Sequence, residues 1–390
     1  MINNLSSLEP RVGQWLADRS DDMIDLLETL VNIDSGSYDK AGVDAVGMEL
    51  SKFLKSYGIE TETIPLENHG DAIRASSGQS SSNRPILLMG HRDTVFPKGE
   101  VSARPFKIED GIAYGPGVAD MKAGLVINSF VLAAMAELGE DAPLVACLYT
   151  GDEEIASPSS RPIIENEARN ARVVFNSEPG RMNGNLVSSR KGGTFYRVEF
   201  TGIPAHSGSQ YEKGRSAIEA MARKIQSWHG LSDIEAGITV NVGLVQGGKS
   251  INMVAPVASC EIDVRYPDMD TRDHIQKRIK EIADKTDIEG TTAELQIMGE
   301  FNPLVESEGA KKLLETYSGV AREHGREVTG EFTGACADSG FAAAVGTPTL
   351  CATGPIGGNV HTPQEYLEVK SVLERAQLLA MTILRLPDDL

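Results

Sequence analysis

Four short apolar segments, each followed at once by polar residues, constrain the fold more than any other feature of this sequence. The segments span residues 86–89, 144–148, 173–175 and 348–351. Continuous apolar runs of this length, bounded by turn residues, are typical of strands buried on both faces of a sheet. Helical stretches such as residues 122–138 lie between them. Alternating strands and helices predict an α/β domain with a mainly parallel central sheet flanked by helices.

The middle of the chain follows a different pattern. Around residue 196, apolar and polar residues alternate, which is typical of a half-exposed strand. The elements expected between about residues 191 and 302 occur in the order strand, helix, strand, strand, helix, strand, and this is the order of the ferredoxin-like unit. We therefore predict an inserted ferredoxin-like α+β domain at residues 191–302. The larger domain is then split between residues 1–190 and 303–390.

Ionisable side chains follow the predicted buried strands at the points where the strands end. In an open α/β sheet, ligands bind outside the carboxyl ends of the strands, so we expect these side chains to converge on one edge. Those that follow the strands are His91, Asp93, Glu153, Glu154, Glu178 and His361. Asp120 is a further candidate, because it lies in a glycine-rich turn just before a predicted helix.

Imidazole and carboxylate groups together are suitable ligands for zinc and related divalent metals. Two histidines with several carboxylates are too many ligands for one catalytic zinc ion, which usually has three. They suit two ions about 3.5–4 Å apart that share a carboxylate, and one carboxylate then remains as a general base. Each motif alone has an ordinary explanation, since acidic pairs are usually solvated. Their occurrence at successive strand ends favours the metal site.

The charge balance excludes some classes of partner. Lys and Arg total 37 against 56 Asp and Glu, so the net charge is -19, and such a field repels nucleic acids and anionic membranes. The four cysteines are far apart in the sequence and form no CxxC pair, so we expect reduced thiols. The sequence begins with no basic and apolar leader, and no apolar run approaches ~18 residues. We therefore expect a cytoplasmic protein with no membrane partner.

Eight motifs together make the sequence recognisable. They are GHRDTV (90–95), YGPGVADMKAG (114–124), GDEE (151–154), SEPG (177–180), GIPAHSG (202–208), GGKSINMVAP (247–256), DVRYPD (263–268) and GPIGGNVHTPQEY (354–366). With these motifs the chain resembles the aminoacylase/glutamate-carboxypeptidase family of dizinc metallopeptidases, and its glutamate carboxypeptidase-like branch in particular. The resemblance implies a zinc exopeptidase-like catalytic domain at residues 1–190 and 303–390, with a lid and dimerisation domain at residues 191–302.

The resemblance also implies ligands for two Zn2+ ions per subunit, with Co2+ or Mn2+ as substitutes. Asp120 matches the carboxylate that bridges the two ions in this family. His361 and Glu154 would complete one zinc site, and His91 and Glu178 would complete the other.

Two further residues of the same region are assigned by the resemblance. Glu153 matches the general base of the family, which takes a proton from the attacking water and later delivers it to the leaving nitrogen. Asp93 would accept a hydrogen bond from the second ring nitrogen of His91 and so fix its tautomer. The residues alone do not decide which of Glu153 and Glu154 is the base and which is the ligand.

Three residues of the inserted domain match substrate-binding positions of the family. His206 would stabilise the oxyanion, typically in the site of the partner subunit, which implies a homodimer through the inserted domain. Asn252 and Arg265 would hold the carboxylate end of the substrate. A bidentate guanidinium suits a free carboxylate, and a strongly acidic protein needs such a local cation for an anionic substrate.

The expected activity is hydrolysis of an amide that releases a C-terminal amino acid from a small peptidyl or N-acyl substrate. Glutamate is one candidate for that amino acid, although residues 301–303 contain no basic side chain to hold a second carboxylate. The alternatives are an N-acyl amino acid deacylase, of the acetylornithine or succinyl-diaminopimelate type, or a dipeptidase. A non-catalytic binding protein is disfavoured, because all the matched ligands and the base are present.

Overall fold

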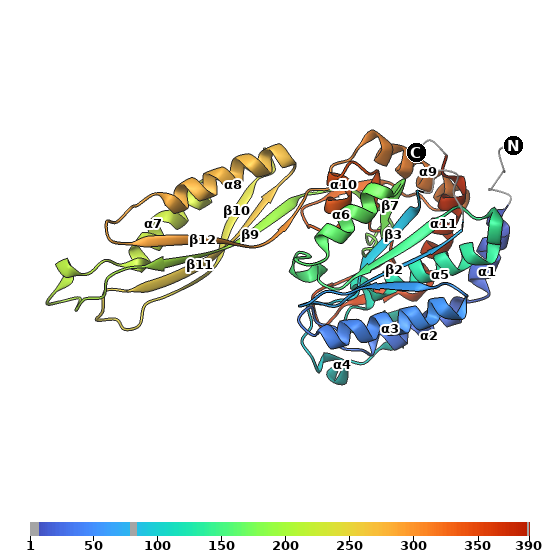
Figure 1. Cartoon of the computed structure of the whole chain (residues 1–390), viewed down its shortest axis with the longest axis horizontal. Coiled ribbons are helices and arrows are strands. Elements are labelled where there is room, and N and C mark those ends of the chain that lie inside the picture. Colours follow the sequence, from blue (N-terminus) through green and yellow to red (C-terminus); the bar gives the residue numbers. More distant parts are fainter. Residues whose placement is uncertain (1–7, 79–83, 388–389) are drawn as a thin grey trace. The chain divides into compact units, whose positions relative to one another are not determined.

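The computed structural model describes residues 8–78, 84–387 and 390, and it divides the chain into two compact units (Figure 1). The larger comprises Met1–Ser189, Leu304–Thr333 and Ala337–Leu390, and the smaller comprises Arg190–Pro303 with Gly334–Cys336. The sequence pattern predicted residues 334–336 as part of the larger domain. They lie with the smaller unit because Arg190 donates to the carbonyl oxygen of Cys336 (3.2 Å), while Arg265 donates to its sulfur (2.7 Å).

The larger unit is built on an eight-stranded sheet. In spatial order its strands are β1 (Thr61–Ile64), β2 (Ala72–Ser77), β6 (Val145–Thr150), β3 (Ile86–His91), β7 (Val173–Asn176), β14 (Thr349–Cys351), β8 (Leu186–Arg190) and β13 (Gly330–Thr333). The four central strands, β6, β3, β7 and β14, run parallel. They are the four strands that the apolar segments predict, so the α/β fold with a parallel sheet centre is confirmed. On either side of them, β2 and β8 pair antiparallel.

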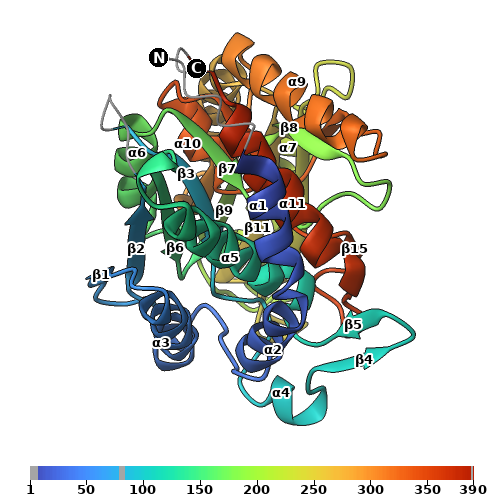
Figure 2. The same cartoon turned by 90° about the vertical axis from the view of Figure 1, so that its right-hand side faces the viewer.

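Helices bury the sheet on both faces, since every residue of β3 and β6 is buried. The helices of this unit are α1 (Glu9–Ala17), α2 (Ser20–Val31), α3 (Lys40–Ser56), α4 (Glu100–Ala103), α5 (Ala123–Leu138), α6 (Arg161–Asn170), α9 (Glu308–Glu323), α10 (Ser339–Ala344) and α11 (Val369–Arg385). Helix α5 packs against β2, β3 and β6, and it lies beside α1 and α11 (Figure 2). Residues 118–141 form the one described helical stretch long and apolar enough to cross a membrane, but its apolar window is entirely buried in this core.

A small second sheet links two loops of the larger unit. Its order is β15 (Gly357–Gly358), β16 (Tyr366–Glu368), β5 (Ile112–Tyr114) and β4 (Lys107–Glu109). The antiparallel pairing of β16 with β5 places Tyr366 opposite Tyr114. The segment before β16 is therefore held beside the segment that follows β5.

The smaller unit is an antiparallel four-stranded sheet with two helices. Its elements are β9 (Gly192–Thr201), α7 (Ala217–His229), β10 (Thr239–Gly247), β11 (Val257–Tyr266), α8 (Met269–Asp284) and β12 (Thr292–Phe301), and the strand order is β10-β11-β9-β12. This chain order and sheet order are those of a ferredoxin-like fold. A separate core that includes Phe200, Trp228 and Ile262 stabilises it.

Gly124 allows the first turn of α5 to contact the segment that follows β7. A Cβ atom at this position would lie 2.0 Å from the carbonyl oxygen of Ser177 and 2.9 Å from the side chain of Met121. Because the contacted atom belongs to the backbone, it cannot rotate away from a side chain. Only glycine therefore allows the helix and the end of the strand to approach this closely.

We expect Gly124→Ala to lower the free energy of unfolding by about 1–3 kcal/mol, because the added methyl group overpacks a rigid contact. Gly319→Ala is the matched control, since it also lies within a helix but a Cβ atom there would meet nothing within 4 Å beyond its own helix; a gain of up to ~1 kcal/mol is expected from helix propensity. Urea unfolding measures both variants. Equal stability of the two variants would show that the close contact at Gly124 is absent in solution.

Candidate metal centre

Ionisable side chains lie close together at the carboxyl ends of three parallel strands of the large sheet. His91 is the last residue of β3, and it is almost fully buried. Glu153 and Glu154 form a 3-10 turn just after β6. Glu178 follows β7 by two residues and is buried. Because β6, β3 and β7 are adjacent and parallel, their ends lie at the same sheet edge, as sequence analysis predicted.

Asp120 reaches this edge from an irregular turn that precedes α5. Residues 118–122 depart from helical geometry at Asp120 and Met121, and the Asp120–Met121 peptide is cis. The carboxylate of Glu365 holds this turn: it accepts hydrogen bonds from the backbone N–H groups of Gly117 (3.0 Å), Ala119 (2.9 Å) and Asp120 (2.9 Å). Glu365 directly precedes β16, so the small sheet places it beside the turn.

Asp120 lies between two imidazole rings. Its Oδ1 atom is 3.2 Å from Nε2 of His91, and its Oδ2 atom is 3.2 Å from Nε2 of His361. Each ring also faces a second carboxylate: Glu178 Oε1 is 3.7 Å from His91 Nε2, and Glu154 Oε2 is 3.1 Å from His361 Nε2. The arrangement is two three-residue groups that share one aspartate.

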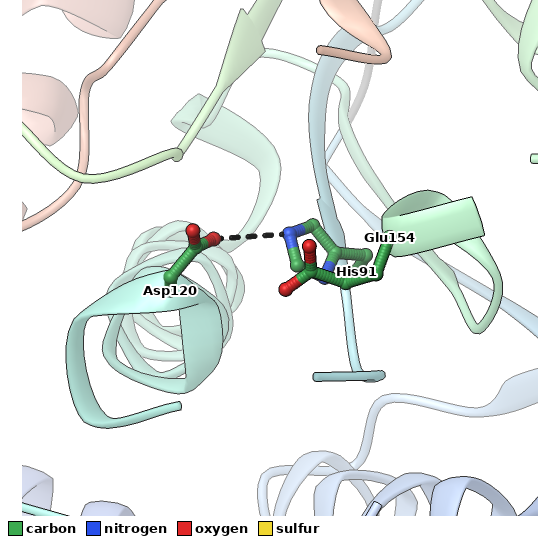
Figure 3. A group of neighbouring side chains, drawn as sticks. All are labelled: His91, Asp120 and Glu154. Atoms are coloured by element: carbon green, nitrogen blue, oxygen red, sulfur yellow. Dashed lines mark ion pairs between the residues drawn. The ribbon is translucent and has the colours of Figure 1, made fainter. Parts of the chain in front are cut away.

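These distances suit metal coordination. Ligand atoms about 2.0–2.1 Å from a tetrahedral zinc ion lie roughly 3.3 Å from one another. His91, Asp120 and Glu154 also satisfy a metal-ligand geometry, with one donor atom of each within 4.8 Å of the others (Figure 3). Nε2 of His91 and Oε1 of Glu154 are buried and form no hydrogen bond among the described residues. Buried polar atoms in that state require a partner, and a divalent cation fits this donor set.

Asp93 organises the site in two ways. Nδ1 of His91 donates to the backbone carbonyl oxygen of Asp93 at 3.0 Å, and the Asp93 carboxylate oxygen Oδ1 is 3.4 Å from the same nitrogen. This leaves Nε2 of His91 available for a metal. The carboxylate also accepts the N–H groups of Glu153 and Glu154, both at 3.1 Å, and the hydroxyl of Ser37 at 2.7 Å.

The electrostatics show how much negative charge is concentrated here. Hydrogen bonds to Asp120 and Glu154 raise the pKa of His361 to about 10. Burial would raise the pKa of Asp120, but the two imidazoles outweigh burial and lower it. Burial, together with the charges of Glu178 and neighbouring carboxylates, raises the pKa of Glu153 well above its usual range, although His91 opposes the shift. Such a cluster binds protons unless a cation replaces them.

Glu153 lies almost as close to His91 as Glu178 does. Its Oε2 atom is 3.8 Å from Nε2 of His91, and its side chain is buried. It therefore lies beside the ligand groups with a carboxyl group whose proton affinity is raised. A general base that operates near neutral pH requires such a raised pKa.

The structure separates the three predicted substrate-binding residues of the smaller unit. His206 and Asn252 lie close together, because Ser207 N–H donates to the carbonyl oxygen of Asn252 (3.0 Å) and His206 bridges to Met253. Both are adjacent to the end of the sheet where Val257 pairs with Thr201. Arg265 is eight residues further along β11, roughly 26 Å away at ~3.3 Å per residue. One chain therefore cannot place all three at a single small substrate.

Arg265 is already held by its own unit. Its Nε and Nη2 atoms donate to the two oxygens of Asp263 at 2.6 and 2.8 Å, and Nη1 donates to the sulfur of Cys336. Its guanidinium also lies over the ring of Phe195, 5.1 Å from the centroid. An arginine has five N–H donors, so these three bonds orient the guanidinium while leaving donors for a further carboxylate.

Two buried acids of this region, Glu365 and Asp338, have no role predicted from the sequence. Glu365 lies inside one of the recognised motifs, but it received no role because an acid in a loop is normally solvated. Asp338 is fully buried, accepts a hydrogen bond from Ser157, and has its pKa raised by burial to about 8. The only signal for Glu365 in the sequence was its position within a motif that carries a candidate ligand, whereas Asp338 lies in none of the recognised motifs. The burial of a loop acid depends on the fold.

We expect Glu365→Gln to weaken metal binding about 10- to 100-fold, the usual effect of removing a residue that orients a ligand. Both carboxylate oxygens of Glu365 accept backbone N–H groups, whereas the amide has only one acceptor oxygen. Its NH2 group would therefore place a donor opposite a backbone N–H donor of the Asp120 turn. Glu368→Gln is the matched control, because Glu368 is three residues away and pairs only with the exposed Lys370 among the described residues. Isothermal titration of the metal-free proteins with Zn2+ measures the difference. Equal affinities of Glu365→Gln and wild-type would exclude this orienting role.

Comparison with known proteins agrees with the site geometry. The profile of peptidase family M20/M25/M40 matches residues 87–385. Carboxypeptidase G2 of a Pseudomonas species is 28% identical over 380 residues, covering 96% of this chain and 91% of that protein. Acetylornithine deacetylase of Pasteurella multocida is 26% identical, covering 86% and 89%. An M20 family metallo-carboxypeptidase from Sulfolobus solfataricus has the same fold, with a TM-score of 0.72 at 18% identity over 93% of this chain and 98% of that chain.

The family match extends over most of the chain and includes the segments that carry His91, Asp120, Glu154, Glu178 and His361. Its relatives are carboxypeptidases and deacetylases, which are hydrolases of amide bonds. The resemblance that the motifs indicated is thereby confirmed, and this hydrolase belongs to peptidase family M20/M25/M40.

Proposed function

We propose that the protein is a dizinc amidohydrolase that releases a C-terminal amino acid, with glutamate as one candidate, from an N-acyl or peptidyl substrate. The observation that carries this proposal is the position of Asp120, whose two oxygens each face a different imidazole at 3.2 Å. A carboxylate in that position suits two ions that share it. We assign His91, Glu178 and Asp120 to one Zn2+, and His361, Glu154 and Asp120 to the other, with Co2+ or Mn2+ as substitutes.

The two ions, when bound, would lower the pKa of a water and polarise the scissile carbonyl. Glu153 accepts the proton of the attacking water and delivers it to the leaving nitrogen, because it is the carboxylate of this cluster left over from the two ligand groups. Asp93 supports both functions: it fixes the ring of His91 and accepts the backbone N–H groups of Glu153 and Glu154.

We propose a homodimer in which the inserted domain supplies His206 and Asn252 to the site of the partner subunit. The separation of Arg265 from these two residues along β11 supports the contribution of more than one chain to a site. A second observation is that β10 is an edge strand with exposed apolar side chains at Leu244 and Val245, since such an edge favours pairing with another chain. Arg265 and Asn252 would hold the substrate carboxylate, and His206 would stabilise the oxyanion.

The alternative is an N-acyl amino acid deacylase or a dipeptidase. Its support is the similarity to acetylornithine deacetylases, although carboxypeptidase G2 matches over more of this chain. The two activities use the same chemistry and differ in which half of the amide is selected. We also propose, on the sequence grounds given above, that the enzyme is cytoplasmic and acts on small molecules alone.

We expect the zinc-loaded protein to hydrolyse a panel of N-acyl and peptidyl amino acids with a preference set by the released amino acid. Glu153→Gln should lower kcat by at least ~10²-fold, since a positioned acid–base group contributes 10²–10⁴-fold. Metal content by elemental analysis is the control, and it should remain near two ions per chain. A variant with full metal content and near-wild-type kcat would refute the assignment of Glu153. Preference for the acyl group alone would favour the deacylase.

We expect activity to return when two inactive variants are mixed. Glu153→Gln disables the site of its own subunit, whereas His206→Ala disables the site of the partner subunit. A mixed dimer therefore keeps one intact site. Random pairing of the two variants then restores about a quarter of wild-type activity. His206→Ala mixed with Asn252→Ala is the control, and it should restore nothing because both residues come from the same subunit. Failure of the first mixture to recover, with dimers verified by light scattering, would place His206 in its own subunit's site.

A further inference from the structure

We propose that Asp338 is a positioning residue of the metal centre, which acts through the hydroxyl group of Ser157. These two residues hold in place the turn that carries Glu153 and Glu154. We call residues 153–157 the Glu153 turn. The inference rests on the proposed function, in which Glu153 is the general base and Glu154 is a zinc ligand. It adds a residue that acts through another residue and not on the substrate itself.

The backbone of the Glu153 turn is strained at its end. Ala156 and Ser157 have φ angles of +70° and +50°, which lie in the left-handed region. An L-residue other than glycine rarely adopts this region, because its Cβ atom crowds the backbone. Residues in this region keep their conformation only where the surrounding structure fixes them. The end of the turn therefore requires contacts that hold it in place.

Hydrogen bonds within the turn set its shape, whereas bonds from outside the turn set its position. The N–H group of Ala156 donates to the carbonyl oxygen of Glu153 at 2.7 Å. The N–H group of Ser157 donates to the carbonyl oxygen of Asp152 at 2.8 Å. Both bonds move with the turn. Asp93 fixes the start of the turn, because its carboxylate accepts two backbone N–H groups there, and the end of the turn needs a second anchor of this kind.

Asp338 supplies this second anchor. The hydroxyl group of Ser157 donates to Oδ1 of Asp338 at 2.5 Å, and both residues are buried. The two residues are 181 positions apart in the sequence, so the bond ties the turn to a distant segment. A buried hydrogen bond does not compete with bulk water, and the loss of either partner leaves the other unsatisfied. The bond is therefore well suited to hold a strained turn.

The segment that contains Asp338 supports this role in two ways. Asp338 is the N-cap residue of α10, a position at which an aspartate side chain usually accepts a backbone N–H group of its own helix. It makes no such bond in the described part of the chain, and its carboxyl group is turned toward Ser157 instead. Helix α10 packs against α6 and β7, and the guanidinium of Arg161 lies 4.8 Å from the ring centroid of Phe341. The core of the larger unit therefore holds the anchor.

The first test changes the anchor in two ways. Asp338→Ala deletes the acceptor of the Ser157 hydroxyl group, whereas Asp338→Asn keeps an acceptor oxygen. At saturating Zn2+, we expect Asp338→Ala to lower kcat by ~10- to 100-fold with little change in KM, because a small displacement of a catalytic group has an effect of this size. Asp338→Asn should retain most of the wild-type kcat. Ser339→Ala is the matched control and should keep wild-type kcat, because its hydroxyl group is also buried but has no partner among the described residues.

A double-mutant cycle shows whether the two residues act as one unit. Ser157→Ala removes a single oxygen atom, so it tests the same bond even if Asp338→Ala does not fold. It should lower kcat as much as Asp338→Ala does, and the double variant should lose no more than either single variant. Losses that add in the double variant would overturn the coupling. A loss in Asp338→Asn equal to that in Asp338→Ala would also overturn it, since the acceptor is retained.

Zinc binding separates this inference from the proposed function. Because the turn carries Glu154, isothermal titration of the metal-free proteins with Zn2+ should show about 10-fold weaker binding in Asp338→Ala and near-wild-type binding in Asp338→Asn. If the wild-type protein hydrolyses no acyl or peptidyl amino acid, the proposed function fails, and the zinc titration alone decides the role of Asp338. If the wild-type protein is active but Asp338→Ala changes neither kcat nor zinc affinity, the proposed function stands and Asp338 is excluded as a positioning residue.

Discussion

The position of the Asp120 carboxylate between two imidazoles is the constraint on which the rest of this site depends. A buried carboxylate is costly unless each oxygen has a partner, and here His91 and His361 face one oxygen each. Each ring also faces a second carboxylate, so the cluster contains more carboxylates than the two histidines can neutralise. Only protons or divalent cations restore the balance, and the raised pKa of His361 shows the protons in that role.

The fold holds this arrangement in place with backbone pairing and with the carboxylate of Glu365. The pairing of β16 with β5 brings the segment after His361 against the segment before Asp120. Glu365, at the start of β16, then binds three backbone N–H groups of the Asp120 turn. Two candidate ligands that are 241 positions apart in the sequence are thereby fixed by one short strand pair and one carboxylate, while the ends of the parallel strands fix the other candidate ligands.

The part of this arrangement that sequence could predict is the part set by local pattern. The apolar segments predicted β3, β6, β7 and β14, because a parallel strand is buried on both faces and its composition shows this directly. The outer strands β1, β2, β8 and β13 were not predicted, since short segments of mixed polarity at a sheet's margin resemble loops. Glu365 and Asp338 escaped for a related reason: whether a loop acid is buried depends on contacts between segments that are distant in the sequence.

The chemistry of the site is easier to recognise from the sequence than its substrate specificity, because specificity depends on contacts between distant segments. The candidate metal ligands follow strands at fixed points, so their motifs are conspicuous. Arg265, a candidate substrate-binding residue, is instead oriented by Asp263 and by Cys336 from a segment 71 residues away. If the two ends of a substrate are bound by separate segments, either preference can change without disturbing the Asp120 turn, and one metal centre can then serve both carboxypeptidases and deacylases.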